Sequence, residues 1–185
     1  GEEDFYQLEA EWRALPAPLD DMNGIYISGN NHSDDLFMFI KRKLEGLEPD
    51  TRYSLTFGAR FATNADSGCF GIGGAPGEDV TVKAGATDHE PLADGQSQGH
   101  IRMNIDHGAQ SNGGSDAIVI GNIANSQDDC VDDRYELKDL DSEGLPFEAF
   151  TDSQGALWVL FATDSGFEGT TGIYYTRVEI RAEKL

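Results

Sequence analysis

Residues 52–61 read RYSLTFGARF, and every second side chain in this stretch is apolar. The apolar positions are Tyr53, Leu55, Phe57, Ala59 and Phe61. A period of two places these side chains on one face of a β-strand and the polar or small ones on the other. The stretch therefore predicts a half-buried antiparallel strand.

The preceding apolar segment, residues 36–40 (LFMFI), has no polar face, which predicts a strand buried on both sides. Between the two segments, residues 48–51 (EPDT) are typical of a turn. We expect residues 33–62 to form one long β-hairpin around this turn. A hairpin is not stable alone in water, so a second layer has to cover it.

Short segments rich in β-forming residues recur along the rest of the chain and are separated by polar turns. The further predicted strands are residues 24–28, 79–84, 100–106, 117–123, 135–137, 147–151, 157–162 and 173–181. Residues 152–155 predict a hairpin turn between two of them, and no helix of ordinary length is predicted after residue 15. This pattern predicts an all-β fold, an antiparallel two-sheet β-sandwich or jelly roll.

The chain shows no internal repeat and no low-complexity linker, so we expect residues 24–185 to form a single β-sandwich domain. Residues 1–23 are acidic and are interrupted by Pro16 and Pro18. They predict an N-terminal arm or edge segment. A helical turn within residues 5–14 is an alternative, because Phe5, Leu8 and Trp12 have helical spacing.

The formal net charge is −21, from 34 acidic and 13 basic residues. Repulsion of other polyanions, and the lack of a basic cluster, argue against nucleic acids and acidic membrane surfaces as partners. No apolar run approaches the length of a membrane span, so we expect no membrane insertion. We also expect the chain to be a monomer. The chain begins with Gly1, which favours a removed targeting segment and a secreted, periplasmic or cell-surface location.

The two cysteines, Cys69 and Cys130, lack the CxxC spacing of zinc sites and redox pairs. A disulfide between them is the preferred interpretation, and the chain-entropy model gives it about 4 kcal/mol of stabilisation. Two unpaired buried thiols are the alternative.

Motifs for catalysis are missing from the sequence. Residues 69–77 (CFGIGGAPG) are rich in glycine, but Pro76 replaces the third glycine of a dinucleotide-binding loop. The histidines, at positions 32, 89, 100 and 107, have no zinc-ligand spacing, and no GxSxG sequence is present. We therefore do not expect an enzyme.

Two segments carry a family resemblance. Residues 44–57 (LEGLEPDTRYSLTF) resemble the LxGLxPxTxYxLxF hairpin of carbohydrate-binding modules of the galactose-binding-like jelly-roll type. Residues 167–180 (FEGTTGIYYTRVEI) look like the last strand of such modules. With Asp164-Ser165-Gly166 they are also similar to uncharacterised secreted bacterial proteins and lipoproteins.

The resemblance implies a glycan ligand and a structural calcium ion held by carboxylates of the first and last strands. Thr176 stands where the last strand of the family usually has an aspartate, so that ligand set does not carry over. Acidic loops offer other oxygen ligands for Ca²⁺. The candidates are Asp34, Asp35, Asp164 and Glu168, together with aspartates 128, 129, 132 and 133. Solvated loops are the alternative interpretation.

The predicted strand 100–106 places Ile101, Met103 and Ile105 toward the core. Its outward side chains are His100, Arg102, Asn104 and Asp106, and Arg60 is outward on its own strand. These five residues are the candidate ligand-binding set, because a row of donors and acceptors suits sugar hydroxyls or a carboxylated ligand. A solvent-exposed sheet face without a ligand is the alternative.

These patterns favour a non-catalytic, secreted module that binds a glycan or another extracellular ligand, with calcium as a candidate structural cofactor. A structural or adhesive cell-surface domain without a small ligand is the first alternative. A jelly-roll enzyme that acts on glycans is the second.

Overall fold

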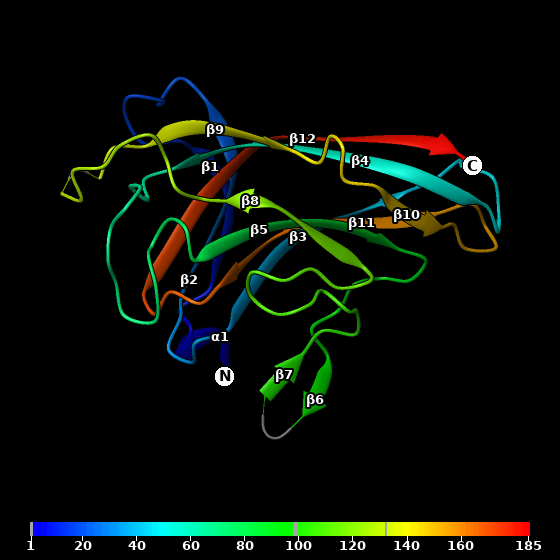
Figure 1. The fold of residues 1–185 in the computed structure, drawn as a ribbon, viewed down its shortest axis with the longest axis horizontal. Helices are drawn as coiled ribbons and strands as arrows, with labels where there is room; N and C mark the ends of the chain where they lie inside the picture. Colours follow the sequence, from blue (N-terminus) through cyan, green and yellow to red (C-terminus); the bar gives the residue numbers. More distant parts are fainter. Residues whose placement is uncertain (1, 98–99, 132) are drawn as a thin grey trace.

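The computed structural model describes residues 2–97, 100–131 and 133–185. Two antiparallel sheets pack face to face, and a small third sheet projects away from them (Figure 1). The larger sheet has the order β1 (Glu9–Ala14), β2 (Asn23–Asn30), β12 (Thr170–Lys184), β4 (Arg52–Thr63) and β10 (Phe147–Phe150), and β9 (Glu136–Asp141) also pairs with β4. The smaller sheet has the order β3 (Leu36–Leu44), β11 (Leu157–Ser165), β5 (Val80–Thr87) and β8 (Ala117–Asn122). The third sheet pairs β6 (Gly95–Ser97) with β7 (His100–Arg102), and one helical turn, α1 (Glu2–Phe5), precedes β1.

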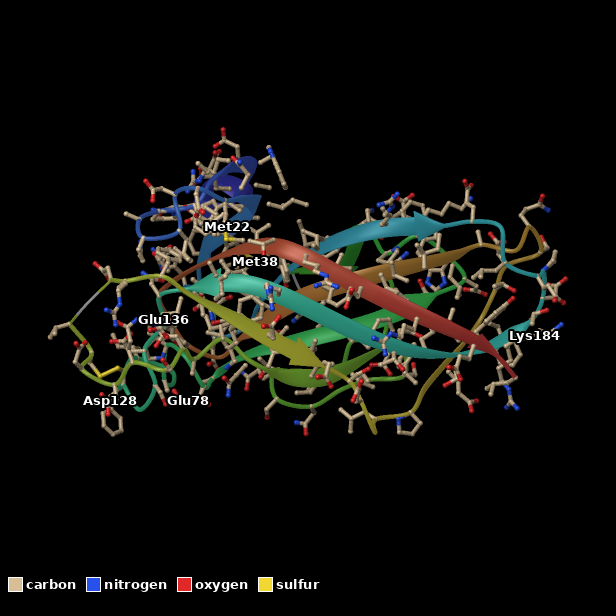
Figure 2. The ribbon with its side chains drawn as sticks, turned by 90° about the horizontal axis from the view of Figure 1, so that it is seen from above. Met22, Met38, Glu78, Asp128, Glu136 and Lys184 are labelled. Carbon is tan, nitrogen blue, oxygen red and sulfur yellow. A yellow bond between two sulfur atoms is a disulfide. The ribbon has the colours of Figure 1, made fainter. Side chains whose placement is uncertain are left out.

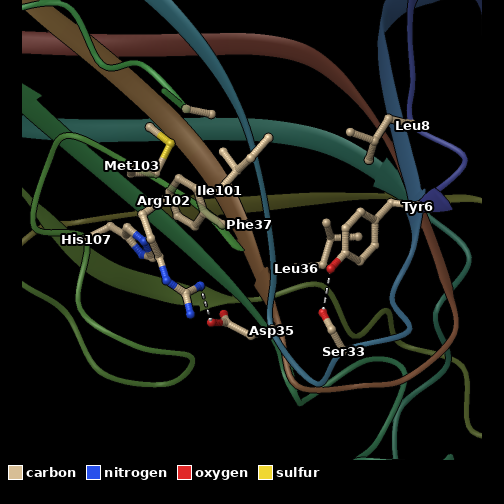
Figure 3. Close-up of a pocket in the computed structure, with 11 residues that line it drawn as sticks. Tyr6, Leu8, Ser33, Asp35, Leu36, Phe37, Ile101, Arg102, Met103 and His107 are labelled. Carbon is tan, nitrogen blue, oxygen red and sulfur yellow. Dashed lines mark hydrogen bonds and ion pairs between the residues drawn. The ribbon is translucent and has the colours of Figure 1, made fainter. Parts of the chain in front are cut away.

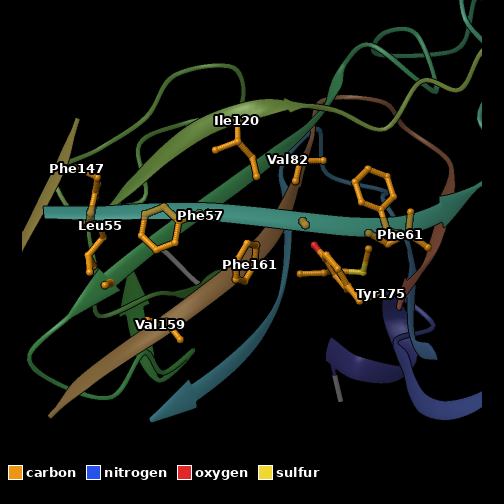
Figure 4. Close-up of a cluster of buried hydrophobic side chains, with 14 of the residues drawn as sticks. Leu55, Phe57, Phe61, Val82, Ile120, Phe147, Val159, Phe161 and Tyr175 are labelled. Atoms are coloured by element: carbon orange, nitrogen blue, oxygen red, sulfur yellow. The ribbon is translucent and has the colours of Figure 1, made fainter. Parts of the chain in front are cut away.

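The core lies between the two main sheets and is built on β4. Its five alternating apolar side chains, predicted above as the buried face, are each at most 7% exposed. Phe57 of this strand meets Phe161 of β11 edge-on across the core, with 6.0 Å between the ring centroids. Val82 of β5 belongs to the same cluster (Figure 4). The predicted all-β, two-sheet sandwich is confirmed.

The predicted hairpin of residues 33–62 is wrong, because β3 and β4 belong to different sheets. β3 pairs with β11 along its whole length, whereas β4 pairs with β12. In the connecting segment the N–H of Leu47 donates to the carbonyl of Gly155, and that of Asp50 to Asp152. The segment therefore binds the β10–β11 connection and crosses between the sheets. For the same reason residues 152–155 do not close a hairpin, since β10 and β11 also lie in different sheets.

The N-terminal region contributes the edge strand β1, which pairs with β2 from Glu9 opposite Ser28 to Ala14 opposite Asn23. The described part of the N-terminal region is helical over Glu2–Phe5 and forms a strand over Glu9–Ala14, so the helical alternative for residues 5–14 is wrong. Among the described residues, no helix is long and apolar enough to cross a membrane.

The predicted strand 100–106 is confirmed for residues 100–102 only. β7 ends at Arg102 and pairs only with β6, after which the chain folds back onto the outer face of the smaller sheet. There Met103 and Ile105 pack against Phe37 and Phe39 of β3. This cover explains why β3 is apolar on both faces. On β5, Thr81 and Lys83 alternate with the core-facing side chains and are buried as well.

Cys69 and Cys130 form a disulfide, with 5.7 Å between their Cα atoms. It joins the β4–β5 connection to the β8–β9 connection. In Figure 2 the disulfide lies at the end of the molecule that carries Asp128 and Glu78, opposite the end that carries Lys184.

Candidate functional site

A pocket of about 380 Å³ opens beside the first residues of β3. In Figure 3, Tyr6 and Leu8 from the N-terminal segment lie on one side of β3, and Arg102 and His107 lie on the other. The pocket is lined by Tyr6, Leu8, Ser33, Asp35, Leu36, Phe37, Ala93, Ile101, Arg102, Met103 and His107. Segments far apart in the sequence therefore meet here because the chain after β7 folds back over β3.

Two of the residues that line this pocket form an ion pair. Arg102 Nη1 lies 3.6 Å from Asp35 Oδ2, and both side chains are about half exposed. Together they offer guanidinium donors and carboxylate acceptors to a ligand. The sequence assigned Arg102 to a ligand-binding row and Asp35 to a calcium site, and the structure brings the two together in one pocket.

On the N-terminal side, the Tyr6 hydroxyl donates to Ser33 Oγ at 2.9 Å. Ser33 is held in turn, because its N–H donates to Asn31 Oδ1 at 3.1 Å. The Asn31 amide is itself fixed by the carbonyls of Ser165 and Phe167. Two hydroxyls are thus presented from a backbone that hydrogen bonds hold in place.

The opposite wall contains His107, whose ring stacks on Phe37 with 4.0 Å between the centroids. Behind the ring lies Asp164, which is fully buried, with Oδ2 3.4 Å from His107 Nδ1. Lys83 Nζ donates to the same Oδ2 at 2.7 Å and to the His107 carbonyl at 2.8 Å. The buried Lys83 thereby ties the loop that carries His107 to the smaller sheet.

Sequence reasoning missed both Lys83 and His107. In β5, Lys83 alternates with the core residues Val82 and Ala84, and this period of two predicts a solvent-exposed side chain. The side chain is instead 0% exposed, because the loop after β7 covers it. The available signal was a lone cation in an otherwise uncharged strand (VTVKAGAT), matched by Asp164 in another strand. A buried charge requires a partner, but only the strand order could show which carboxylate supplies it.

Two members of the predicted ligand-binding row hold loops together. The Asn104 amide accepts from the Leu92 N–H and donates to the Glu90 carbonyl, both at 2.8 Å. Asp106 accepts hydrogen bonds from the N–H groups of Ser115 and Gly108, and these bonds lower its pKa. These side chains are exposed but engaged within loops, and beyond Arg102 they do not continue the row along a strand.

Arg60 lies on the other sheet, where its guanidinium binds Asp139 of β9 at 2.7 and 2.8 Å. This hydrogen-bonded pairing lowers the pKa of Asp139. Arg60 does not line the pocket. The backbone of His100 belongs to β7, but its side chain lies outside the described part of the structure.

The carboxylates predicted to bind calcium do not share a site. Asp164 binds Lys83, Asp35 faces Arg102, and the Asp34 carbonyl accepts from the Gln110 amide. A buried ammonium 2.7 Å from Asp164 would repel a cation, so this position does not fit calcium. Within residues 2–97, 100–131 and 133–185, no group of three or more His, Cys, Asp or Glu side chains is arranged to hold a metal ion. Asp132 lies outside these ranges, and calcium binding stays a prediction without an assigned site.

A second hollow of about 340 Å³ lies beside the disulfide, and its lining includes Asp66, Phe70 and Val131. Both oxygens of Asp66 already accept hydrogen bonds, from the Asn125 amide and the Cys130 N–H. The pocket beside β3 is the stronger candidate, because an ion pair, hydroxyls and stacked rings converge there.

No family model matches the chain, and no curated protein matches its sequence. A candidate sugar-binding protein from Bacteroides thetaiotaomicron VPI-5482 is similar in structure, with 12% identity and a TM-score of 0.46, over 95% of this chain and 82% of that chain. The enzymatically active domain of tailspike protein 4 from bacteriophage CBA120 has 11% identity and a TM-score of 0.40, over 95% of this chain and 18% of that chain. At this level neither likeness carries an argument about ligands.

Proposed function

We propose that this chain is a non-catalytic carbohydrate-binding module and that the pocket beside β3 holds the sugar. The observation that carries the proposal is the convergence of the Arg102–Asp35 ion pair, the Tyr6–Ser33 hydroxyls and the stacked Phe37–His107 rings. A sugar presents hydroxyl groups around its edge and C–H groups on its faces. The polar groups match the hydroxyls, and the apolar wall matches the faces.

The size of the pocket supports a small ligand. A volume of about 380 Å³ lies toward the lower end of the range for small-molecule sites. This volume suits a short glycan, or one end of a longer glycan, better than it suits a macromolecular ligand.

A location outside the cytosol is part of the proposal. The disulfide between Cys69 and Cys130 supports it, because such bonds persist mainly in oxidising compartments. A thiol assay on the protein isolated from its native source tests this point. Free thiols in the native protein would contradict it.

The proposal is tested by a binding screen against a panel of mono-, oligo- and polysaccharides, run once with Ca²⁺ and once with EDTA. We expect at least one ligand to bind in both buffers, since the pocket contacts do not depend on a metal ion. In ¹H–¹⁵N spectra of the labelled protein, this ligand should shift the amide signals of residues 33–37 and 101–107. Failure of every glycan in both buffers would contradict the proposal and favour a structural or adhesive domain.

A further inference from the structure

The charges around the pocket are balanced, which limits the kind of sugar that fits. Among the described residues lining the pocket, Arg102 is the only one with a permanent positive charge, and Asp35 faces it at 3.6 Å. The buried cation Lys83 is neutralised by Asp164. An anionic ligand would therefore compete with Asp35 for Arg102 and would face the overall charge of −21.

His107 is the pocket residue whose ring faces the buried Lys83–Asp164 pair. Its Nδ1 is buried and lies 3.4 Å from Asp164 Oδ2, longer than an ordinary N–H···O bond. Asp164 is held as a carboxylate by Lys83, so it can only accept. Nδ1 can face this oxygen favourably only when it carries the proton, and a slight rotation of the ring then shortens the contact.

The Lys83 ammonium and the Asp164 carboxylate already neutralise each other behind the His107 ring. A protonated imidazole would add a second cation beside a carboxylate that Lys83 already neutralises, on a side chain that is only 18% exposed. A neutral ring with the proton on Nδ1 avoids this cost and leaves Nε2 as a hydrogen-bond acceptor. His107 lines the pocket and its Nδ1 is buried, which leaves Nε2 as the ring nitrogen available to a ligand.

We propose that the pocket selects an uncharged, hydroxyl-bearing sugar over its carboxylated counterpart, with His107 Nε2 and Asp35 accepting from ligand hydroxyls and Arg102 donating to them. This inference rests on the proposed sugar-binding function. Asp164 and Lys83 are positioning residues: they set the tautomer of His107 and anchor its loop without touching the ligand.

The first test compares matched ligands. Each neutral sugar that binds in the screen is paired with the uronic acid of the same stereochemistry, and both are titrated by isothermal calorimetry. We expect the uronic acid to bind at least tenfold more weakly. Equal or tighter binding of the uronic acid would overturn the inference while leaving sugar binding intact, whereas binding of neither compound would overturn both.

The second test reads the tautomer without any ligand. Long-range ¹H–¹⁵N spectra of the histidine rings distinguish a protonated nitrogen from an acceptor nitrogen. We expect His107 to show a protonated Nδ1 and a free Nε2 at neutral pH. Protonation on Nε2, or on both nitrogens, would overturn the assignment.

The third test uses variants. His107→Leu should weaken binding at least tenfold, and His89→Leu, which removes a ring that does not line the pocket, should leave it within twofold.

The double variant Lys83→Met/Asp164→Leu removes the buried pair without leaving one charge alone. It should yield mixed His107 tautomers and weaker binding at unchanged near-ultraviolet circular dichroism. Should the double variant not fold, His107→Gln, which keeps a side-chain acceptor, should bind better than His107→Leu. An unchanged tautomer in a folded double variant would contradict the positioning role of Lys83 and Asp164. Equal losses in the two His107 variants would contradict the acceptor role of His107 Nε2.

Discussion

Asp106 and Asn104 show how a polar side chain is assigned once its neighbours are known. Both lie in a segment whose alternation is typical of a solvent-exposed strand face. In the structure the Asn104 amide and both carboxylate oxygens of Asp106 instead form hydrogen bonds within the loops of this region. Side chains that line the pocket, such as Asp35 and His107, carry no distinguishing local pattern. At the scale of single residues, the exposure of side chains could be predicted in part from the sequence. Their interaction partners could not, because these depend on the path of the backbone, which local alternation does not reveal.

The lowered pKa of Asp106 predicts how its loop responds to acid. Hydrogen bonds from the N–H groups of Ser115 and Gly108 favour the carboxylate, so the folded pKa lies below the unfolded value of about 3.9. The stabilisation is present above that value and is lost as pH falls through the folded pKa. We expect the protection factor of the Ser115 amide against hydrogen exchange to decrease as the pH falls through the folded pKa, and a carboxyl titration by NMR to give a midpoint below about 3.9. A midpoint at or above the unfolded value would contradict the observed hydrogen bonds.

At the scale of elements, alternation predicted the buried face of a strand and not its neighbour. β4 buries its apolar side as expected, but β3 and β4 contribute to one core from opposite sheets, and so do β10 and β11. A connection that bridges two sheets can have the same composition as a hairpin turn. The difference lies in long-range hydrogen bonds, such as that from Leu47 to Gly155. Strand partners therefore could not be predicted from local sequence.

The disulfide makes a prediction at this scale, because it joins two long connections at one end of the sandwich. In the chain-entropy model, Cys69→Ala/Cys130→Ala should lower the free energy of unfolding by about 4 kcal/mol. Urea unfolding followed by tryptophan fluorescence measures the change. Unchanged stability would show that the two connections are held by their other contacts, such as the Cys130 N–H to Asp66.

For the whole molecule, composition was informative about partners. A net charge of −21 with balanced charges in the pocket predicts that binding of a neutral sugar responds weakly to salt. Affinity measured at about 0.05 M and about 0.5 M NaCl should agree within roughly twofold, because no net ion pair forms with the ligand. Binding that weakens steeply as salt is added would instead indicate an anionic ligand.

The central claim is that the pocket beside β3 binds sugar through Arg102. Its most direct test is calorimetric titration of the best glycan from the screen into the native chain, Arg102→Ala and Arg52→Ala. Arg52 is the matched control, since it is similarly exposed and pairs with Glu148 at 3.3 Å on the other sheet. We predict a loss of about tenfold or more, about 1.4 kcal/mol, for Arg102→Ala and a change within twofold for Arg52→Ala. Equal affinities for all three proteins would contradict the claim.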